Sequence, residues 1–153
     1  MKLYQLKRKQ KLPISINEAW TFFSDPKNLK KITPPEMNFR ILSGAERSIY
    51  SGQIIQYKVT PLMGITTRWV TEITNVRHKE YFVDEQRYGP YSLWHHKHFL
   101  KEIKGGVEME DIIDYKIPLG ILGQLAHILF VKNKLNKIFK YRENKLVELF
   151  GKI

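Results

Sequence analysis

The sequence contains no cysteine, which excludes disulfide bonds, thiolate metal sites and cysteine nucleophiles. A chain without cysteine fits a reducing compartment, and we expect a cytoplasmic location. The opening residues, MKLYQLKRKQKL, are basic but lack the apolar centre of a secretory signal, so no signal peptide is expected. No apolar run approaches the roughly 20 residues that a membrane span needs. The longest, at 121–131, is interrupted by Gly123, Gln124 and His127.

Acidic residues are also scarce, with 15 Asp and Glu against 26 Lys and Arg, which gives a formal net charge of +11. Such an excess is typical of proteins that contact nucleic acid or an anionic membrane. Here the cations are scattered over three regions, so we favour an ordinary solvated surface, with weak contact to RNA or membrane as an alternative. The three groups are Lys7, Arg8, Lys9 and Lys11; Lys27, Lys30 and Lys31; and Lys132, Lys134, Lys137, Lys140, Arg142 and Lys145.

The length of 153 residues is typical of one domain, and we expect a single domain over 1–153. Residues 3–12 predict a strand. Ser15 followed by Glu18 is a capping box, which predicts a short helix. Asp25 before Pro26 predicts a second short helix, which the TPP sequence at 33–35 ends.

From residue 37 to residue 117 the hydrophobic pattern has a period of two, which is typical of strands. We expect strands at 37–43, 52–61, 65–76, 80–88, 91–103 and 107–117, joined by turns at 43–44, 51–52, 63–64, 88–90 and 104–106. Such short connections predict an antiparallel meander. The rest of the chain predicts one long helix, with an apolar stripe at three- and four-residue spacing. The stripe is Leu125, Ile128, Leu129, Leu135, Ile138, Phe139, Leu146 and Leu149.

These elements predict an α+β fold. One sheet and one long helix must bury their apolar faces against each other. We therefore expect a curved antiparallel β-sheet wrapped around a long C-terminal α-helix, with two short helices between the first and second strands. Where the lining side chains do not fill the space between sheet and helix, an internal cavity remains.

The alternation on the last strand decides which face of the sheet points inward. Glu108, Glu110 and Asp114 share one face, which must therefore be the solvent face, and the opposite face points toward the helix. Residues directly opposite each other on neighbouring antiparallel strands share a face. The predicted pairs are Trp94 with Tyr115, His96 with Ile113 and His98 with Asp111, and, across the preceding turn, Phe82 with His96 and Asp84 with Trp94.

The inward face is expected to combine large apolar side chains with a polar group. Each polar side chain would cost about 1–3 kcal/mol if it were buried without a partner, so these residues pair with one another, with water or with a ligand. A concave apolar pocket with a few convergent polar groups is the usual form of a binding site. The predicted ligand contacts are Tyr57, Trp69, Phe82, Asp84, Gln86, Trp94, His96, His98, Met109, Asp111, Ile113, Tyr115, Leu122, Leu125 and Leu129.

Six short sequences occur in order along the chain: FSDPKNL at 23–29, TPP at 33–35, FVDEQ at 82–86, GPY at 89–91, WHHKH at 94–98 and PLGILG at 118–123. Taken together, they resemble the SRPBCC superfamily (the START-like helix-grip fold), and in particular its bacterial polyketide cyclase/coenzyme-Q-binding-like branch. The resemblance spans essentially the whole chain. It implies a deep pocket for lipids, polyketides, isoprenoid quinones or other apolar molecules. Because the superfamily includes transfer proteins, cyclases and hydrolase-like enzymes, the resemblance alone does not assign an activity.

Three functions remain open at this point. The leading one is binding or transfer of a small, largely apolar molecule, with no cofactor. The second is a small cyclase or isomerase, in which His96 or His98 with Asp111 moves a proton. The third is the basic adaptor that contacts RNA, the ribosome or an anionic membrane. A metal held by the same histidines with Asp111 or Asp84 is weighed against a structural polar network, and the network is favoured.

The segment before the long helix is a candidate gate. Leu119, Ile121 and Leu122 stand among Gly120 and Gly123, and glycines permit a segment to move. Apolar side chains at such a place can cover the mouth of a cavity.

Overall fold

The computed structural model describes residues 2–62 and 64–153. Within these ranges it contains one seven-stranded antiparallel sheet, in the order β1-β7-β6-β5-β4-β3-β2. The predicted meander is therefore confirmed, and β1 closes it by pairing with β7. Of the predicted turns, the one at 63–64 includes Met63, which lies outside the described residues. The strands are β1 (Tyr4–Leu12), β2 (Arg40–Ser43), β3 (Gln53–Leu62), β4 (Ile65–Arg77), β5 (Tyr81–Tyr88), β6 (Leu93–Ile103) and β7 (Gly106–Lys116).

The two short helices begin where their caps predict. In α1 (Ile16–Phe23) the Ser15 hydroxyl accepts from the Glu18 amide, and the Glu18 carboxylate accepts from the Ser15 amide at 2.9 Å. The second helix is the 3-10 helix η1 (Pro26–Ile32), capped by the Asp25 carboxylate. The strand predicted at 37–43 starts late, at Arg40. The reason is a further 3-10 turn, η2 (Pro35–Met37), which is followed by a left-handed residue.

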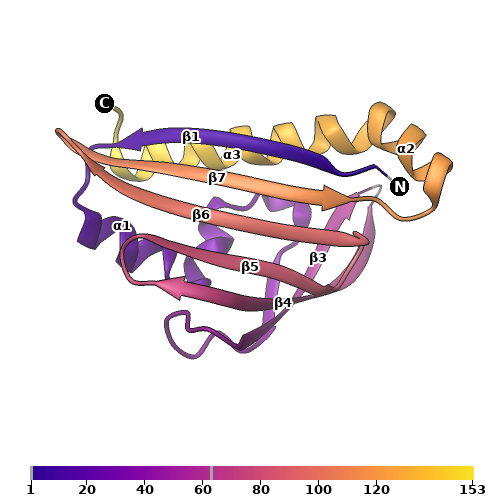
Figure 1. Ribbon diagram of the computed structural model, residues 1–153, viewed down its shortest axis with the longest axis horizontal. Coiled ribbons are helices and arrows are strands. Elements are labelled where there is room, and N and C mark those ends of the chain that lie inside the picture. The colour runs from indigo at the N-terminus through magenta and orange to yellow at the C-terminus, as the bar shows by residue number, and fades with distance from the viewer. Residues whose placement is uncertain (1, 63) are drawn as a thin grey trace.

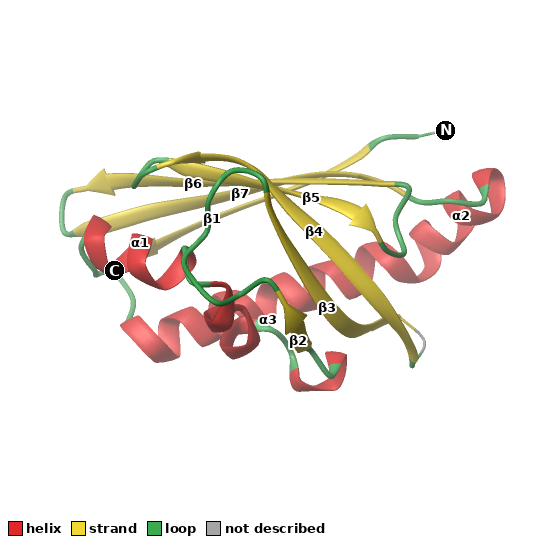
Figure 2. Cartoon of the chain, turned by 90° about the horizontal axis from the view of Figure 1, so that it is seen from below, coloured by secondary structure: helices red, strands yellow, loops and turns green. Residues whose placement is uncertain are grey.

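The sheet curves around the long helix (Figures 1 and 2). The last helix, α3 (Lys132–Phe150), runs along the concave side of the sheet, and α1 lies beside its C-terminal end. The other end of the molecule holds α2 (Gly120–Ala126) and the tip of the β3–β4 hairpin in both views. The expected arrangement of sheet, short helices and long C-terminal helix is thus confirmed. At the end of the molecule away from α1, α2 and the β3–β4 hairpin flank the region between helix and sheet.

The C-terminal helical region is continuous but not uniform. Between α2 and α3 the chain forms a π-helical turn, η3 (His127–Val131), which adds a residue to the turn and changes the face that points inward. The apolar stripe predicted from 125 onward is therefore wrong at its start: Leu125, Ile128 and Leu129 are exposed, while His127 and Val131 are buried. Leu149, the last residue of the predicted stripe, is exposed as well. From Leu135 to Leu146 the stripe points inward as predicted. No helix among the described residues is long and apolar enough to cross a membrane.

The predicted pairing of the last two strands is confirmed residue by residue: Trp94 opposes Tyr115, His96 opposes Ile113 and His98 opposes Asp111. The pairing of β5 with β6 is shifted by two residues from the prediction, so that Phe82 opposes His98 and Asp84 opposes His96. The side-chain amide of Gln86 donates a hydrogen bond to the Tyr91 C=O and accepts one from the Tyr91 N–H. These two bonds hold a wider turn between the strands, which accounts for the shift. A shift of two keeps every side chain on its predicted face.

Candidate functional site: a cavity with a buried polar cluster

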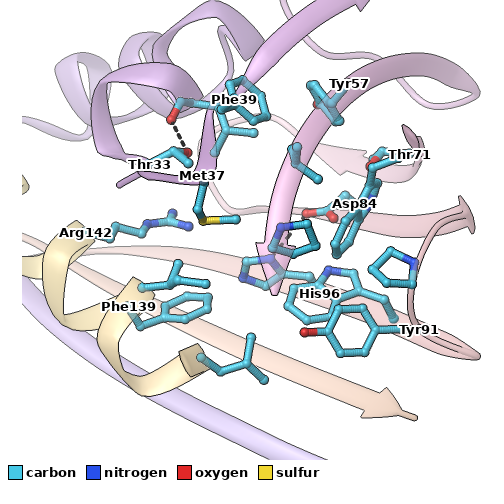
Figure 3. Close-up of a pocket in the computed structure, with 18 of the residues that line it drawn as sticks. Thr33, Met37, Phe39, Tyr57, Thr71, Asp84, Tyr91, His96, Phe139 and Arg142 are labelled. Carbon is cyan, nitrogen blue, oxygen red and sulfur yellow. Dashed lines mark hydrogen bonds and ion pairs between the residues drawn. The ribbon is translucent and has the colours of Figure 1, made fainter. Parts of the chain in front are cut away.

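A cavity of about 430 Å³ lies between the curved sheet and the long helix (Figure 3). Its wall is mostly apolar, and α1, η1, η2 and the segment before α2 complete it. The strands and α3 supply the following wall residues: Ile55, Tyr57 and Val59 from β3; Trp69, Thr71 and Ile73 from β4; Phe82 and Asp84 from β5; Trp94, His96 and His98 from β6; and Leu135, Ile138, Phe139 and Arg142 from α3.

One part of this wall carries a polar cluster of five side chains. His96 Nε2 lies 3.0 Å from Asp111 Oδ1, at hydrogen-bond distance. His98 Nε2 lies 2.7 Å from Asp84 Oδ2, and its Nδ1 is 3.0 Å from Asp111 Oδ1 without hydrogen-bond alignment. Arg142 Nη2 approaches Asp111 Oδ1 at 3.6 Å. In Figure 3, Asp84, His96 and Arg142 extend toward one space from three different elements.

The charges of the cluster balance one another. Burial would raise the pKa of Asp111, but the charge of Arg142 and the hydrogen bond from His96 hold that pKa well below its ordinary value. Burial also opposes ionisation of Asp84, yet the charges of His96 and His98 lower its pKa. Burial and the charge of His98 lower the pKa of His96. Burial acts in the same direction on His98, but the carboxylates of Asp111 and Asp84 outweigh it and raise its pKa. Two carboxylates therefore face Arg142 and His98, whose protonated form they favour.

The two histidines consequently differ in the direction of their pKa shifts. The hydrogen bond from His96 to an ionised Asp111 requires a proton on Nε2, and His96 Nδ1 lies 3.5 Å from Asp84 Oδ2. The rings of His96 and His98 lie close, with centroids 3.7 Å apart, and Phe82 stacks on His98. Two imidazoles with oppositely shifted pKa values thus stand side by side at the cavity wall.

The structure brings about half of the predicted ligand contacts to the cavity wall. These are Tyr57, Trp69, Phe82, Asp84, Trp94, His96, His98 and Leu122. Asp111 lies behind the wall and touches the cavity only through the histidines and Arg142 that it holds. The remaining predicted contacts, which the structure places elsewhere, are Gln86, Met109, Ile113, Tyr115, Leu125 and Leu129.

Each of these displaced residues has a structural reason. Gln86 closes the β5–β6 turn. Met109 packs in the core near α1, and Ile113 packs against the π-helical turn and α3. The hydroxyl of Tyr115 is 2.8 Å from His127 Nε2, so both polar groups are satisfied away from the cavity. Leu125 and Leu129 are on the solvent side because of the π-helical turn.

Arg142 is the most informative residue that the sequence prediction missed. It was grouped with the solvated lysines, yet it is buried, at 8% exposure, and lies on the cavity wall. A signal was present: Arg142 follows Phe139 by three residues and precedes Leu146 by four, which places it on the apolar stripe. A cation on such a stripe needs a buried partner, and Asp111 is that partner.

Asp84, His96 and His98 also form the one group of potential metal ligands found among the described residues. Their ligand atoms lie within 4.8 Å of one another. Two imidazoles and a carboxylate are a known donor set for transition metals, and Asp111 occupies the place of an outer hydrogen-bond partner to His96. Arg142, whose Nη2 lies 3.6 Å from Asp111 Oδ1, adds positive charge beside this group.

Comparisons with known proteins establish the fold. No protein-family model matches the sequence, and a search of curated proteins finds no match. Among solved structures, the chain is similar to protein CV1439 from Chromobacterium violaceum, at 16% identity and a TM-score of 0.70, with 97% of this chain and 99% of that chain covered. Protein Ms6760 from Mycobacterium smegmatis matches at 15% identity and a TM-score of 0.66, with 97% and 98% covered. Ara h 8.0201 matches at 15% identity and a TM-score of 0.65, with 96% and 99% covered.

These matches confirm the helix-grip fold that the sequence resemblance indicated. At such identities the likeness concerns the fold and leaves the ligand open.

Proposed function

We propose that the protein binds and transfers a small, largely apolar molecule in the cavity between its sheet and its long helix. The observation that carries this proposal is the cavity itself, about 430 Å³ in volume and walled mainly by aromatic and aliphatic side chains. This volume lies within the usual range of roughly 300–1,000 Å³ for small-molecule sites. An empty apolar space of this size would forfeit packing energy, so a ligand is the natural occupant.

The polar end of the ligand is expected at the cluster. The Nε atom of Arg142 is buried and has no hydrogen-bond partner among the described residues. The hydroxyl of Tyr57 stands on the same wall, and burial together with the charge of Asp84 raises its pKa, so it remains a proton donor. A carbonyl or hydroxyl oxygen of the ligand would satisfy these donors, while its apolar body contacts Trp69, Trp94 and Phe139.

The test begins with native mass spectrometry of the protein purified from its own host, followed by extraction and identification of any bound molecule. Ala126→Trp should reduce loading strongly, because Ala126 lines the cavity and a larger side chain there projects into it. Asn133→Trp is the matched control, since Asn133 is on the exposed side of the same helical region. Circular dichroism would check that both variants fold. Two results together would overturn the proposal: the purified protein carries no ligand, and Ala126→Trp leaves the affinity for added apolar probes unchanged.

A second candidate function, proton-transfer catalysis as in a cyclase or isomerase, is favoured by one observation. The pKa of His96 is lowered and that of His98 is raised, and environments that separate two pKa values are how enzymes obtain an acid and a base at one site. Once the ligand is identified, the protein should catalyse exchange of the ligand's acidic C–H protons with deuterium from D₂O, and NMR would measure this exchange. His98→Gln should abolish exchange and retain binding. Absence of exchange in the wild type would leave the cluster as a ligand grip only.

A further inference from the structure

The segment that covers the cavity mouth is more apolar on its outer side than on its inner side. Seven large apolar side chains between 119 and 130 are between 53% and 83% exposed, whereas the residues turned inward include the small Gly123 and Ala126. Monomeric soluble proteins rarely expose a contiguous apolar patch larger than a few hundred Å². We call this set the mouth patch: Leu119, Ile121, Leu122, Leu125, Ile128, Leu129 and Phe130.

Local backbone geometry produces this reversed arrangement. Leu119 has a left-handed conformation with φ of 70°, which starts α2 at an abrupt angle. Gly123 packs so closely on Pro118 that a Cβ atom there would overlap the Pro118 carbonyl oxygen. The inner face is therefore held against the protein by a residue without a side chain. The π-helical turn then directs His127 and Val131 inward and leaves Phe130 outside.

Cations predominate around the mouth patch, and Glu36 pairs with Lys134 one turn beyond Phe130. The sequence has no acidic residue between Asp114 and Glu143. Lys132 follows the patch directly, and together with Lys2 it stands near enough to His127 that, after burial, these two charges lower the pKa of that histidine. Neither Lys132 nor Lys137 forms an ion pair with any described residue. Apolar side chains flanked by lysines that have no ion-pair partner among the described residues match the surface of a bilayer that contains anionic lipid.

The position of the patch connects it with the cavity. Leu119 and Leu122 are exposed and also line the cavity, so the patch forms part of the rim. Across the opening, Pro61 of β3 lines the cavity, and Ile65 of β4 is 67% exposed at the same hairpin. A bilayer pressed against this rim would meet the opening of the cavity directly.

We propose that residues 118–132 dock on the surface of a bilayer containing anionic lipid, with the mouth patch inserted among the lipids and the cavity opening toward them. The docking itself rests on the exposed side chains and charges described above. Its use for delivering or collecting a ligand rests on the proposed function. The excess of cations favours an anionic lipid surface over a second copy of this chain, whose net charge of +11 would repel the first.

The test is flotation with vesicles of phosphatidylcholine alone and of phosphatidylcholine mixed with phosphatidylglycerol. The full-length protein should float with the mixed vesicles, and rising salt should weaken the association. Ile121→Asp and Phe130→Asp change exposed patch residues that do not line the cavity, and each should weaken partitioning about tenfold or more. Ile54→Asp, at an exposed apolar residue on the outer face of β3, makes the same charge change and should float like the wild type.

Three results would overturn the docking proposal. The first is a wild type that does not float. The second is an equal loss in Ile54→Asp, which would indicate general adhesion of a basic protein. The third is a dimer in sedimentation experiments that Ile121→Asp dissociates, which would assign the patch to a second copy. Bound ligand is measured in the same proteins. A wild type that holds ligand but does not float counts against this proposal alone, and a wild type that floats with an empty cavity counts against the proposed function alone.

Discussion

Replacing Arg142 with methionine removes one of the two cations that balance the buried carboxylates. Methionine is apolar and of similar length, so it can keep the contacts with Phe23 and Phe139, whose rings lie 5.8 Å from the guanidinium. What is lost is the charge 3.6 Å from Asp111. The variant therefore tests the electrostatic balance of the cluster more than its packing.

The magnitude follows from the burial of the partner left behind. Asp111 is 1% exposed, so water cannot replace the missing cation. Removing one member of a buried ion pair typically costs about 3–5 kcal/mol. Protonation of His96 can then replace the missing positive charge. At a pH above the pKa of His96, protonating this ring costs about 1.4 kcal/mol for each pH unit above that pKa. We therefore expect a loss of about 3 kcal/mol at neutral pH and a smaller loss in acid, where His96 accepts a proton readily.

Urea unfolding measures this loss as a change in midpoint at constant slope. The cost should be larger at alkaline than at mildly acidic pH, and the imidazole resonances of His96 should titrate at higher pH in Arg142→Met than in the wild type. Lys140→Met is the control, because Lys140 pairs with Glu143 on the exposed face of the same helix and such pairs contribute little.

The reasoning is refuted by additivity in a double-mutant cycle. Asp111→Asn removes the unpaired carboxylate, so Arg142→Met combined with Asp111→Asn should be clearly more stable than the sum of the single losses predicts. If the two losses simply add, or if Arg142→Met costs no more than Lys140→Met, the two charges are not coupled and the assigned balance is wrong.

The remaining predictions concern the histidines and the cavity mouth. Because the pKa of His98 is raised in the folded state, the stability that His98 contributes is fully present below its ordinary pKa of 6.5 and is lost as pH rises through the folded-state pKa. The destabilisation by His98→Gln, measured by urea unfolding, should therefore shrink as pH increases. A difference that does not depend on pH would contradict this. Tyr115→Phe should cost about 1–2 kcal/mol in the same assay, because it leaves buried His127 without its 2.8 Å hydrogen bond; an unchanged midpoint would show that the bond contributes nothing. Gly123→Ala should cost about 1–3 kcal/mol and speed amide exchange over 119–126, because its Cβ meets the Pro118 carbonyl; protection equal to the wild type would contradict that contact. Added Co²⁺ should give no visible spectrum of a bound metal, because Arg142 and His98 already neutralise the carboxylates; a stoichiometric spectrum that His98→Gln abolishes would replace the polar network with a metal site.

The sheet side of the site could be predicted because strand alternation is strict. Once Glu108, Glu110 and Asp114 are assigned to solvent, a short turn at 104–106 places His98 opposite Asp111, as the structure confirms. The β5–β6 pairing was missed by two residues because it depends on how Gln86 holds the turn, and a side-chain bond of that kind has no periodic signal in the sequence. This two-residue error in register assigned the wrong cross-strand partners, but it kept every side chain on its correct face of the sheet.

The helix side of the site was predicted less well because its period changes. A stripe extrapolated at 3.6 residues per turn through a π-helical turn loses its phase, which is why Leu125 and Leu129 lie outside. The same extrapolation from Leu135 onward holds its phase, and it would have placed Arg142 inside had its charge not been taken as a mark of the surface. The strand register alone brings together two carboxylates and two histidines. When only one of the two imidazoles is protonated, this group needs one more positive charge to be neutral. That deficit predicts a buried cation on the facing helix, and Arg142 is the residue on the apolar stripe that can meet it.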